Sequence, residues 1–315
     1  FHIISNTAYA CQYIVYEFTA KTKHYVLFCF EKLNIPRTKE RFMLDIKVFM
    51  RYNLIDKKEK ETMLFVDGLS VYARYLHGGG AIVSDVHFCV GDGQSLAIVG
   101  ESGSGKSMIV DSLIGALADN CYATGKIVFD GEDILASPRA LSRRLGKSIA
   151  FIPQGASESL NPSLKIKTQI YEAFARSGEK LNKHEKKAYA LYNLAKVGLK
   201  DESVLEKYPF EISGGQAQRV VLAIALCSKP KLIVADEATR GIDAETAEVF
   251  LKCVKEEFQD SAKIFVTHDM SLAKTCDKVL VLKAGEQVEY GFSEDVLVHP
   301  ESEYTQLLLK KAAQE

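Results

Sequence analysis

One stretch has the residue types and spacing to bind a nucleoside triphosphate, Gly100-Glu101-Ser102-Gly103-Ser104-Gly105-Lys106-Ser107. It follows the apolar run 96–99 and precedes the amphipathic run 108–117, an order that predicts strand, loop and helix. The glycines let the backbone approach phosphate oxygens closely, and the helix N-terminus adds its positive dipole end. Lys106 can reach the β- and γ-phosphates, and the Ser107 hydroxyl can ligate Mg²⁺. We therefore predict a triphosphate site formed by residues 100–107 together with Met108.

A second stretch, Leu232-Ile233-Val234-Ala235-Asp236-Glu237, is an apolar run that ends in two acids. A buried strand that ends at the phosphate site can place Asp236 beside the magnesium. Glu237 can then act as a general base on the attacking water. An acidic turn after a strand is common by itself, but the glycine-rich loop earlier in the chain favours the catalytic interpretation.

The third stretch, Ser213-Gly214-Gly215-Gln216, opens a predicted helix over 217–227. Ser213 can cap this helix, and the glycines leave its N–H groups accessible to an anion. One nucleotide does not need two such helix ends in the same chain. This pattern predicts that one of them is presented to a nucleotide bound by a partner.

With these three motifs in order, the chain resembles the ATP-binding cassette (ABC) family over about 63–315, because Ile212-Ser213-Gly214-Gly215-Gln216 is similar to the family signature Leu-Ser-Gly-Gly-Gln. The resemblance implies an α/β fold of the P-loop NTPase type. It has a RecA-like core, an antiparallel β subdomain and a helical signature subdomain, here about 155–228. It also implies hydrolysis of ATP with Mg²⁺ as cofactor.

The resemblance assigns further residues one by one. Gln154 matches the glutamine that touches magnesium, so Mg²⁺ would be held by Ser107, Gln154 and Asp236. His268 matches the histidine that contacts the γ-phosphate and acts with Glu237 in catalysis. Asp243 matches an aspartate that communicates across a dimer of cassettes, in which Ser213, Gly214, Gly215 and Gln216 face the partner's ATP.

Two departures from the family pattern bear on these assignments. The segment Ala238-Thr239-Arg240-Gly241-Ile242-Asp243 stands where the family usually has Pro-Thr-Ser-Ala-Leu-Asp, which puts the contact across the dimer in question. The aromatic residue that stacks on adenine would fall at Ala73. Either Tyr72 or Tyr75 could replace it, or the stacking contact is weak.

Three segments indicate a branch of the family, since 157–162, 208–211 and 302–308 resemble ATPases of oligopeptide, dipeptide and nickel importers. This implies a subunit that powers import of peptides, nickel or a metal–chelator complex from the cytoplasmic face of the membrane. Its partners would be two permease subunits, a sister ABC ATPase in a homo- or heterodimer and, indirectly, an extracytoplasmic solute-binding protein. The alternative is a soluble ABC ATPase outside transport, although the interval 154–213 is too short for the long coiled coil of the DNA-repair members.

The composition of the chain narrows the classes of partner and site that it can have. The net charge of −1 gives no overall attraction to nucleic acid, and we expect no nucleic-acid partner. The seven cysteines are scattered without a Cys-x-x-Cys pair, which suits a reducing compartment and argues against a zinc site. No apolar run approaches the roughly 18 residues that a membrane span needs.

Residues 1–62 carry no nucleotide, metal or catalytic motif, and they are rich in aromatic and basic residues. They are either sequence upstream of a start at Met63 or a small accessory domain of unknown role, and the residues alone do not separate the two. Because no part of the ATP site lies there, we expect residues 63–315 to fold and bind ATP without them.

Overall fold

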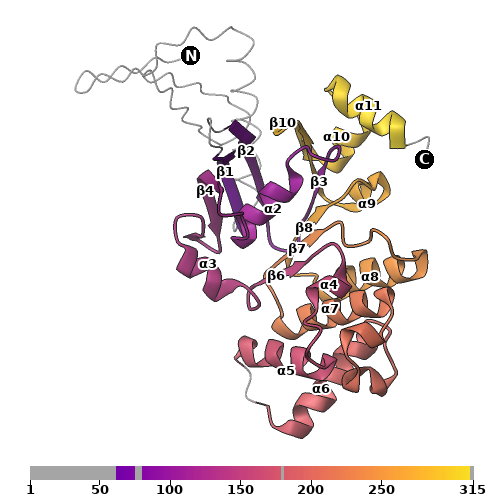
Figure 1. Cartoon of the computed structure of the whole chain (residues 1–315). Helices are drawn as coiled ribbons and strands as arrows, with labels where there is room; N and C mark the ends of the chain where they lie inside the picture. The colour runs from indigo at the N-terminus through magenta and orange to yellow at the C-terminus, as the bar shows by residue number, and fades with distance from the viewer. Residues whose placement is uncertain (1–61, 75–79, 179–180, 313–315) are drawn as a thin grey trace, which may run out of the picture. The chain divides into compact units, whose positions relative to one another are not determined.

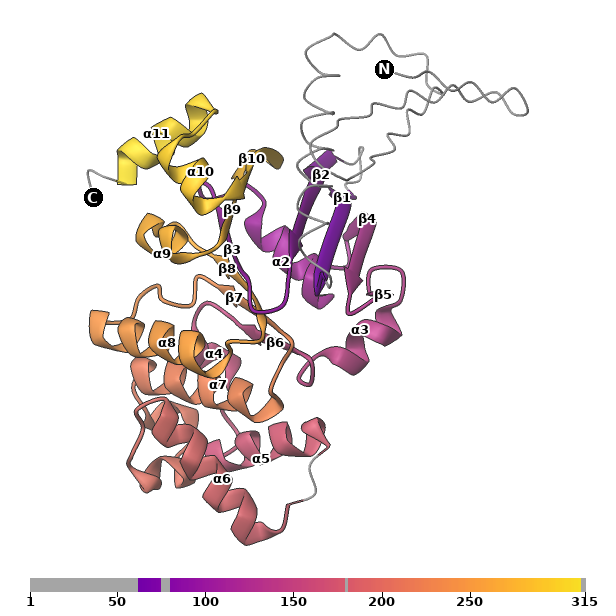
Figure 2. The same cartoon turned by 180° about the vertical axis from the view of Figure 1, so that it is seen from behind.

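The computed structural model describes residues 62–74, 80–178 and 181–312. Except for Thr62, the N-terminal segment 1–62 lies outside these residues, so its role stays a prediction. Tyr75 and most of the glycine turn at 78–80 also lie outside them. The rest of the chain is shown in Figure 1 and, from behind, in Figure 2.

The described residues form a ten-stranded sheet in the order β5-β4-β1-β2-β10-β9-β3-β8-β7-β6. The strands are β1 (Leu64–Ala73), β2 (Gly80–Val90), β3 (Ser95–Val99), β4 (Cys121–Phe129), β5 (Glu132–Asp133), β6 (Ile149–Ile152), β7 (Leu232–Asp236), β8 (Ala262–Val266), β9 (Lys278–Lys283) and β10 (Glu286–Phe292).

The sheet has two halves of different character. Strands β5, β4, β1 and β2 pair antiparallel, whereas β9, β3, β8, β7 and β6 pair parallel. Strand β10 joins them, antiparallel to β9 and parallel to β2. The parallel strands are short, nearly continuous apolar runs, as expected for strands covered on both faces. The expected RecA-like core and antiparallel β subdomain are confirmed.

The helices are α2 (Lys106–Ile114), α3 (Pro138–Arg144), α4 (Ala156–Ser159), α5 (Ile166–Ser177), α6 (Lys183–Lys196), α7 (Gly214–Ser228), α8 (Ala244–Glu257), α9 (Met270–Thr275), α10 (Ser293–Val298) and α11 (Glu303–Ala312). Short 3₁₀ turns cover Glu202–Glu206 and Pro209–Glu211.

Helix α7 packs against α4, α5, α6 and α8. Phe174 of α5 is fully buried, and its ring lies 4.8 Å from that of Tyr189 in α6. Helices α5, α6 and α7 form the expected helical subdomain, at the lower end of both views (Figures 1 and 2).

Helix α2 is shorter than the apolar spacing predicts. It ends at Ile114 rather than near Leu117, because Gly115 adopts a left-handed conformation with φ 67° and its N–H bonds the Asp111 carbonyl. A Cβ at Gly115 would lie 2.7 Å from the Leu141 side chain. The glycine therefore stops the helix, as left-handed C-terminal glycines commonly do.

Strands β2 and β4 begin at Gly80 and Cys121. The first two residues of each strand are exposed or partly buried, and they pair with β1. Across the described residues, no helix is both long enough and apolar enough to cross a membrane.

Candidate active site

The parallel register brings the predicted site residues to one edge of the sheet. Strand β3 lies between β9 and β8, and β7 and β6 follow on the β8 side. Ile98 pairs with Val266, Asp236 pairs with Val266, and Ile152 pairs with Ala235. The residues just beyond these pairs therefore leave the sheet side by side. They are the loop 100–107, His268, Glu237 and Gln154.

The glycine-rich loop is curled around the Lys106 side chain. The buried Lys106 Nζ donates to the carbonyls of Gly100 at 2.8 Å and Glu101 at 2.9 Å. A Cβ at Gly100 would lie 2.2 Å from the Leu282 carbonyl oxygen, so this position requires glycine. Ser104 Oγ is buried and, among the residues described, has no hydrogen-bond partner. A buried ammonium and an unpaired hydroxyl inside the loop suit an anionic ligand.

The two acids at the end of β7, Asp236 and Glu237, lie where a bound cation would offset their negative charge. Burial raises the pKa of Asp236, and the nearby charges of Glu237 and Asp111 act in the same direction, whereas the Ser107 hydroxyl and Lys106 oppose them. Burial likewise lowers the pKa of Lys106, against the attraction of Glu237 and Asp236. A hydroxyl and carboxylates gathered beside a phosphate loop fit the oxygen ligands that Mg²⁺ prefers. Ser107 and Asp236 lie together here.

Gln154 is exposed two residues beyond β6. The structure brings it to the same sheet edge as Asp236, but its contact with a metal stays a prediction.

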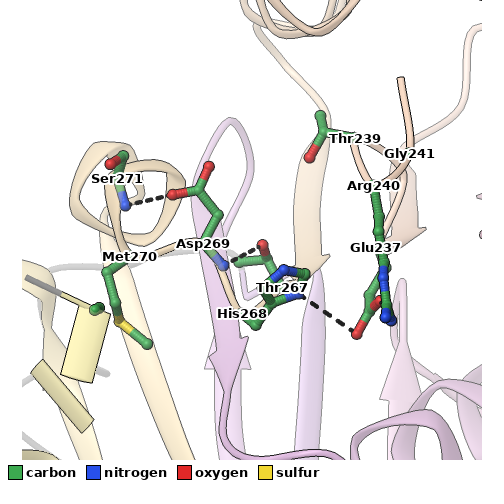
Figure 3. A pocket seen from close by; sticks show the side chains of 10 residues that line it. Glu237, Thr239, Arg240, Gly241, Thr267, His268, Asp269, Met270 and Ser271 are labelled. Atoms are coloured by element: carbon green, nitrogen blue, oxygen red, sulfur yellow. Dashed lines mark hydrogen bonds and ion pairs between the residues drawn. The ribbon is translucent and has the colours of Figure 1, made fainter. Parts of the chain in front are cut away.

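Glu237 lies at the side of a hollow of about 450 Å³. Its backbone is left-handed, with φ 43°, an uncommon and strained conformation for a residue other than glycine. Glu237 Oε2 accepts a hydrogen bond from Arg240 Nη1 at 2.6 Å, and His268 Nδ1 lies 3.8 Å from Oε1 (Figure 3). The hollow is lined by Glu237, Thr239, Arg240, Gly241, Thr267, His268, Asp269, Met270, Ser271 and Ala312. The predicted base and the predicted γ-phosphate contact thus meet at one opening.

The C-terminal helix α11 contacts the glycine-rich loop, which the sequence did not reveal. The Glu101 N–H donates to the Tyr304 hydroxyl at 3.3 Å, and Lys311 Nζ lies 2.7 Å from Glu101 Oε1. The bond to Lys311 lowers the pKa of the exposed Glu101 carboxyl. Ala312, the last residue of α11, reaches the hollow beside Glu237. No sequence motif predicts these contacts, because 203 positions separate Glu101 and Tyr304.

The signature residues Ser213 to Gln216 form the start of α7. Ser213 Oγ accepts from the Gln216 N–H at 3.2 Å, and the Gln216 side chain accepts from the Ser213 N–H at 3.1 Å. The predicted cap is therefore confirmed. Gly214 is exposed beside it. Helix α7, which these residues open, and helix α2, which follows the glycine-rich loop, lie apart in both views (Figures 1 and 2).

Asp243 caps helix α8 within its own chain. Its carboxylate accepts from the Thr246 N–H and from the Thr246 hydroxyl, both at 2.8 Å, and these bonds lower its pKa. Arg219 of α7 donates to the same hydroxyl at 3.2 Å. The start of α8 is thereby joined to the signature helix. A contact of Asp243 across a dimer stays a prediction.

The position expected to stack on adenine offers no aromatic ring. Ala73 is buried, and the ring of Tyr72 stacks on Tyr122 at 5.2 Å, with the Arg74 guanidinium 4.9 Å from the Tyr122 centroid. Tyr75, the other alternative, lies outside the described residues. Tyr72 is therefore already engaged on the neighbouring strand β4.

Comparison with known proteins agrees with this geometry. The family model of the ABC transporter matches residues 83–240. The metal-staphylopine import system ATP-binding protein CntD of Staphylococcus aureus is 39% identical over 235 residues, 72% of this chain and 86% of CntD. The oligopeptide transport ATP-binding protein OppD of Bacillus subtilis is 35% identical over 254 residues, 78% of this chain and 71% of OppD.

Among solved structures, a dimeric ATP-binding cassette in a post-hydrolysis state bound to ADP and Pi superposes with a TM-score of 0.65 at 25% identity. The match covers 73% of this chain and 99% of that cassette.

The first prediction concerns Lys106. Lys106→Ala removes a charge-assisted contact to a polyanion, and contacts of this kind contribute about 1.5–3 kcal/mol each, so ATP affinity should fall roughly ten- to a hundredfold. Equilibrium binding of a fluorescent ATP analogue measures this. Lys147→Ala, an exposed lysine near β6, is the matched control and should bind normally. Unchanged affinity of Lys106→Ala would remove Lys106 from the phosphate site.

The second prediction concerns α11. Tyr304→Phe deletes the hydroxyl that holds the Glu101 amide, and a hydrogen bond of this kind contributes about 1 kcal/mol. ATP affinity should drop about fivefold as the loop loses its fixed start. The same binding assay applies, with Lys310→Ala on an exposed face of α11 as the control. Wild-type affinity for Tyr304→Phe would mean that α11 covers the loop without ordering it.

Proposed function

The chain belongs to the ABC transporter family, and from this premise we propose that it is the ATP-hydrolysing subunit of an importer for peptides, nickel or a metal–chelator complex. The observation that carries the proposal is that Lys106, Asp236 and Glu237 meet at one sheet edge. Against the effect of burial, the charges of Glu237 and Asp236 raise the pKa of Lys106, and the charges of Glu237 and Lys106 act on the pKa of Asp236. The dimeric cassette with ADP and Pi supports ATP as the nucleotide.

The names of the relatives support the proposed classes of solute. CntD is named for metal-staphylopine import, OppD for oligopeptides, and the Lactococcus lactis relative DppD, 35% identical over 257 residues, for dipeptides. The segments 157–162, 208–211 and 302–308 resemble the same branch. These names all describe transport, which supports the importer over a soluble ATPase outside transport.

Each residue of the site has a role in the proposed reaction. Lys106 binds the β- and γ-phosphates. Ser107, Asp236 and Gln154 would together hold Mg²⁺, which neutralises phosphate charge when bound. Glu237 accepts the proton of the attacking water, and His268 contacts the γ-phosphate. The left-handed backbone of Glu237 fits this role, because strained conformations gather at active sites.

The signature residues would complete the site of a second cassette. Ser213 and Gly214 are exposed at the start of α7, a helix that lies apart from α2 in both views (Figures 1 and 2). We infer that they bind the γ-phosphate held by a sister ATPase, with Gly215, Gln216 and Asp243 at the same contact. ATP would then hold two cassettes together, and hydrolysis would release them.

A permease is the partner proposed for a second hollow of about 560 Å³ between β6 and the helical subdomain. Apolar residues such as Phe151, Leu160 and Ile224 line it, together with the polar Gln169, Glu172 and Arg176. Pro153 lines it as well and directly precedes Gln154. If Gln154 contacts the metal as proposed, one loop would border both this hollow and the nucleotide site, which suits coupling to a membrane partner at the cytoplasmic face. The arrangement proposed is two permease subunits over two cassettes.

The third prediction tests the base and the dimer together. Glu237→Gln keeps the size of the side chain but loses its basicity, so turnover should fall by about 10²–10⁴ while ATP binding stays normal. Persisting ATP should then hold this chain to its sister ATPase, as measured by ATP-dependent mass in size-exclusion chromatography. Glu248→Gln, an exposed acid on α8, is the control for charge loss. Near-normal turnover would refute the base, and slow turnover without a dimer would refute Ser213 acting across the interface.

A further inference from the structure

Arg240 interrupts the family pattern and contacts the proposed base directly. Its Nη1 donates to Glu237 Oε2 at 2.6 Å, from a position three residues further along the chain. The Arg240 side chain is 54% exposed, but that of Glu237 is only 13% exposed. An ion pair between two exposed groups contributes little, whereas a charge-assisted bond to a mostly buried carboxylate is short and directional.

The backbone holds this pair in one geometry. The Glu237 N–H donates to the Val266 carbonyl of β8 at 2.9 Å, and the Glu237 carbonyl accepts from the Arg240 N–H at 2.9 Å. Glu237 is thus tied to the sheet on one side and to the turn on the other. The left-handed φ of 43° at Glu237 sets the direction in which its side chain leaves the strand. The bond from Arg240 then fixes the carboxylate at the far end of that side chain.

The bond from Arg240 engages one carboxylate oxygen of Glu237 and leaves the other available to accept a proton. Oε2 is occupied by Arg240, and Oε1 faces the hollow with His268 Nδ1 at 3.8 Å (Figure 3). A glutamate side chain has three rotatable bonds, and freezing such freedom before reaction is a main source of catalytic rate. A general base must also lie within hydrogen-bond reach of the proton that it removes.

We propose that Arg240 is a positioning residue that holds the Glu237 carboxylate so that Oε1 is the oxygen presented to the attacking water. This rests on the proposed function of Glu237 as the base. In the step, a water O–H bond breaks and its proton goes to Oε1. The water oxygen bonds the γ-phosphorus as the bond to the β,γ-bridging oxygen breaks, and ADP leaves with that oxygen.

The competing interpretation is that Arg240 serves the dimer instead, because it lies in the segment that leads to Asp243. The two roles differ in what they require of Glu237. A positioning residue has nothing left to position once the carboxylate is replaced by an amide. A dimer contact would still matter in that background.

The test uses the full chain, with and without its sister ATPase, and compares Arg240→Ala, Arg240→Lys and Glu237→Gln singly and combined. Arg240→Ala should lower kcat about tenfold with the KM for ATP within about twofold, because the base is misplaced and binding is untouched. Arg240→Lys should recover part of kcat. Arg240→Ala added to Glu237→Gln should lower neither turnover nor ATP-dependent association further. Arg143→Ala, an arginine 74% exposed on α3, controls for loss of charge, and melting temperatures confirm that each variant is folded.

Three outcomes would overturn the inference. A kcat for Arg240→Ala equal to or above that of the wild type would show that the carboxylate needs no such support. Weaker ATP-dependent association of the double variant than of Glu237→Gln alone would assign Arg240 to the dimer. Normal turnover of Glu237→Gln would remove the proposed base itself, and so separates failure of the proposed function from failure of the positioning role.

Discussion

The site depends on the register of three parallel strands. The pairs Ile98–Val266 and Asp236–Val266 align β3, β8 and β7, and the Thr267 N–H bonds the Ile98 carbonyl just beyond them. A slip of one residue would turn every side chain of a strand to the other face of the sheet. Asp236 would then point away from Ser107. The apolar residues of these strands keep the register, because a slip would expose the core.

Within that frame, the balance of charge favours a polyanion and a cation together. The Lys106 ammonium is buried and donates hydrogen bonds to two carbonyls of its own loop. Burial disfavours the charged form of this group and lowers its pKa. The raised pKa of Asp236 means that its ionised form is less favourable in the folded chain than in the unfolded one, so this group removes stability as the pH rises past its ordinary value. A phosphate beside Lys106 and a cation beside Asp236 would relieve both costs.

The parts predicted from sequence are those fixed by local rules. The strand–loop–helix order, the Ser213 cap and the two acids at the end of β7 follow from short-range patterns and agree with the structure. The contact of Tyr304 with Glu101 could not be predicted, since it depends on where the last helix folds back. Arg240 and Glu237 are only three positions apart, but their hydrogen bond depends on the left-handed backbone at Glu237. No residue type in this segment predicts that conformation. The apolar pattern predicts too long an α2, because Gly115 stops the helix within an otherwise helical run.

The most direct measurement is a high-resolution structure of the full chain with Mg²⁺ and a slowly hydrolysed ATP analogue. We expect the γ-phosphate between Lys106 and His268, the metal on Ser107 and Asp236, and a water between Glu237 Oε1 and the γ-phosphorus. We also expect Ser213 of a second cassette on the same phosphate. A triphosphate bound away from this sheet edge, or a γ-phosphate out of reach of Glu237, would contradict this expectation.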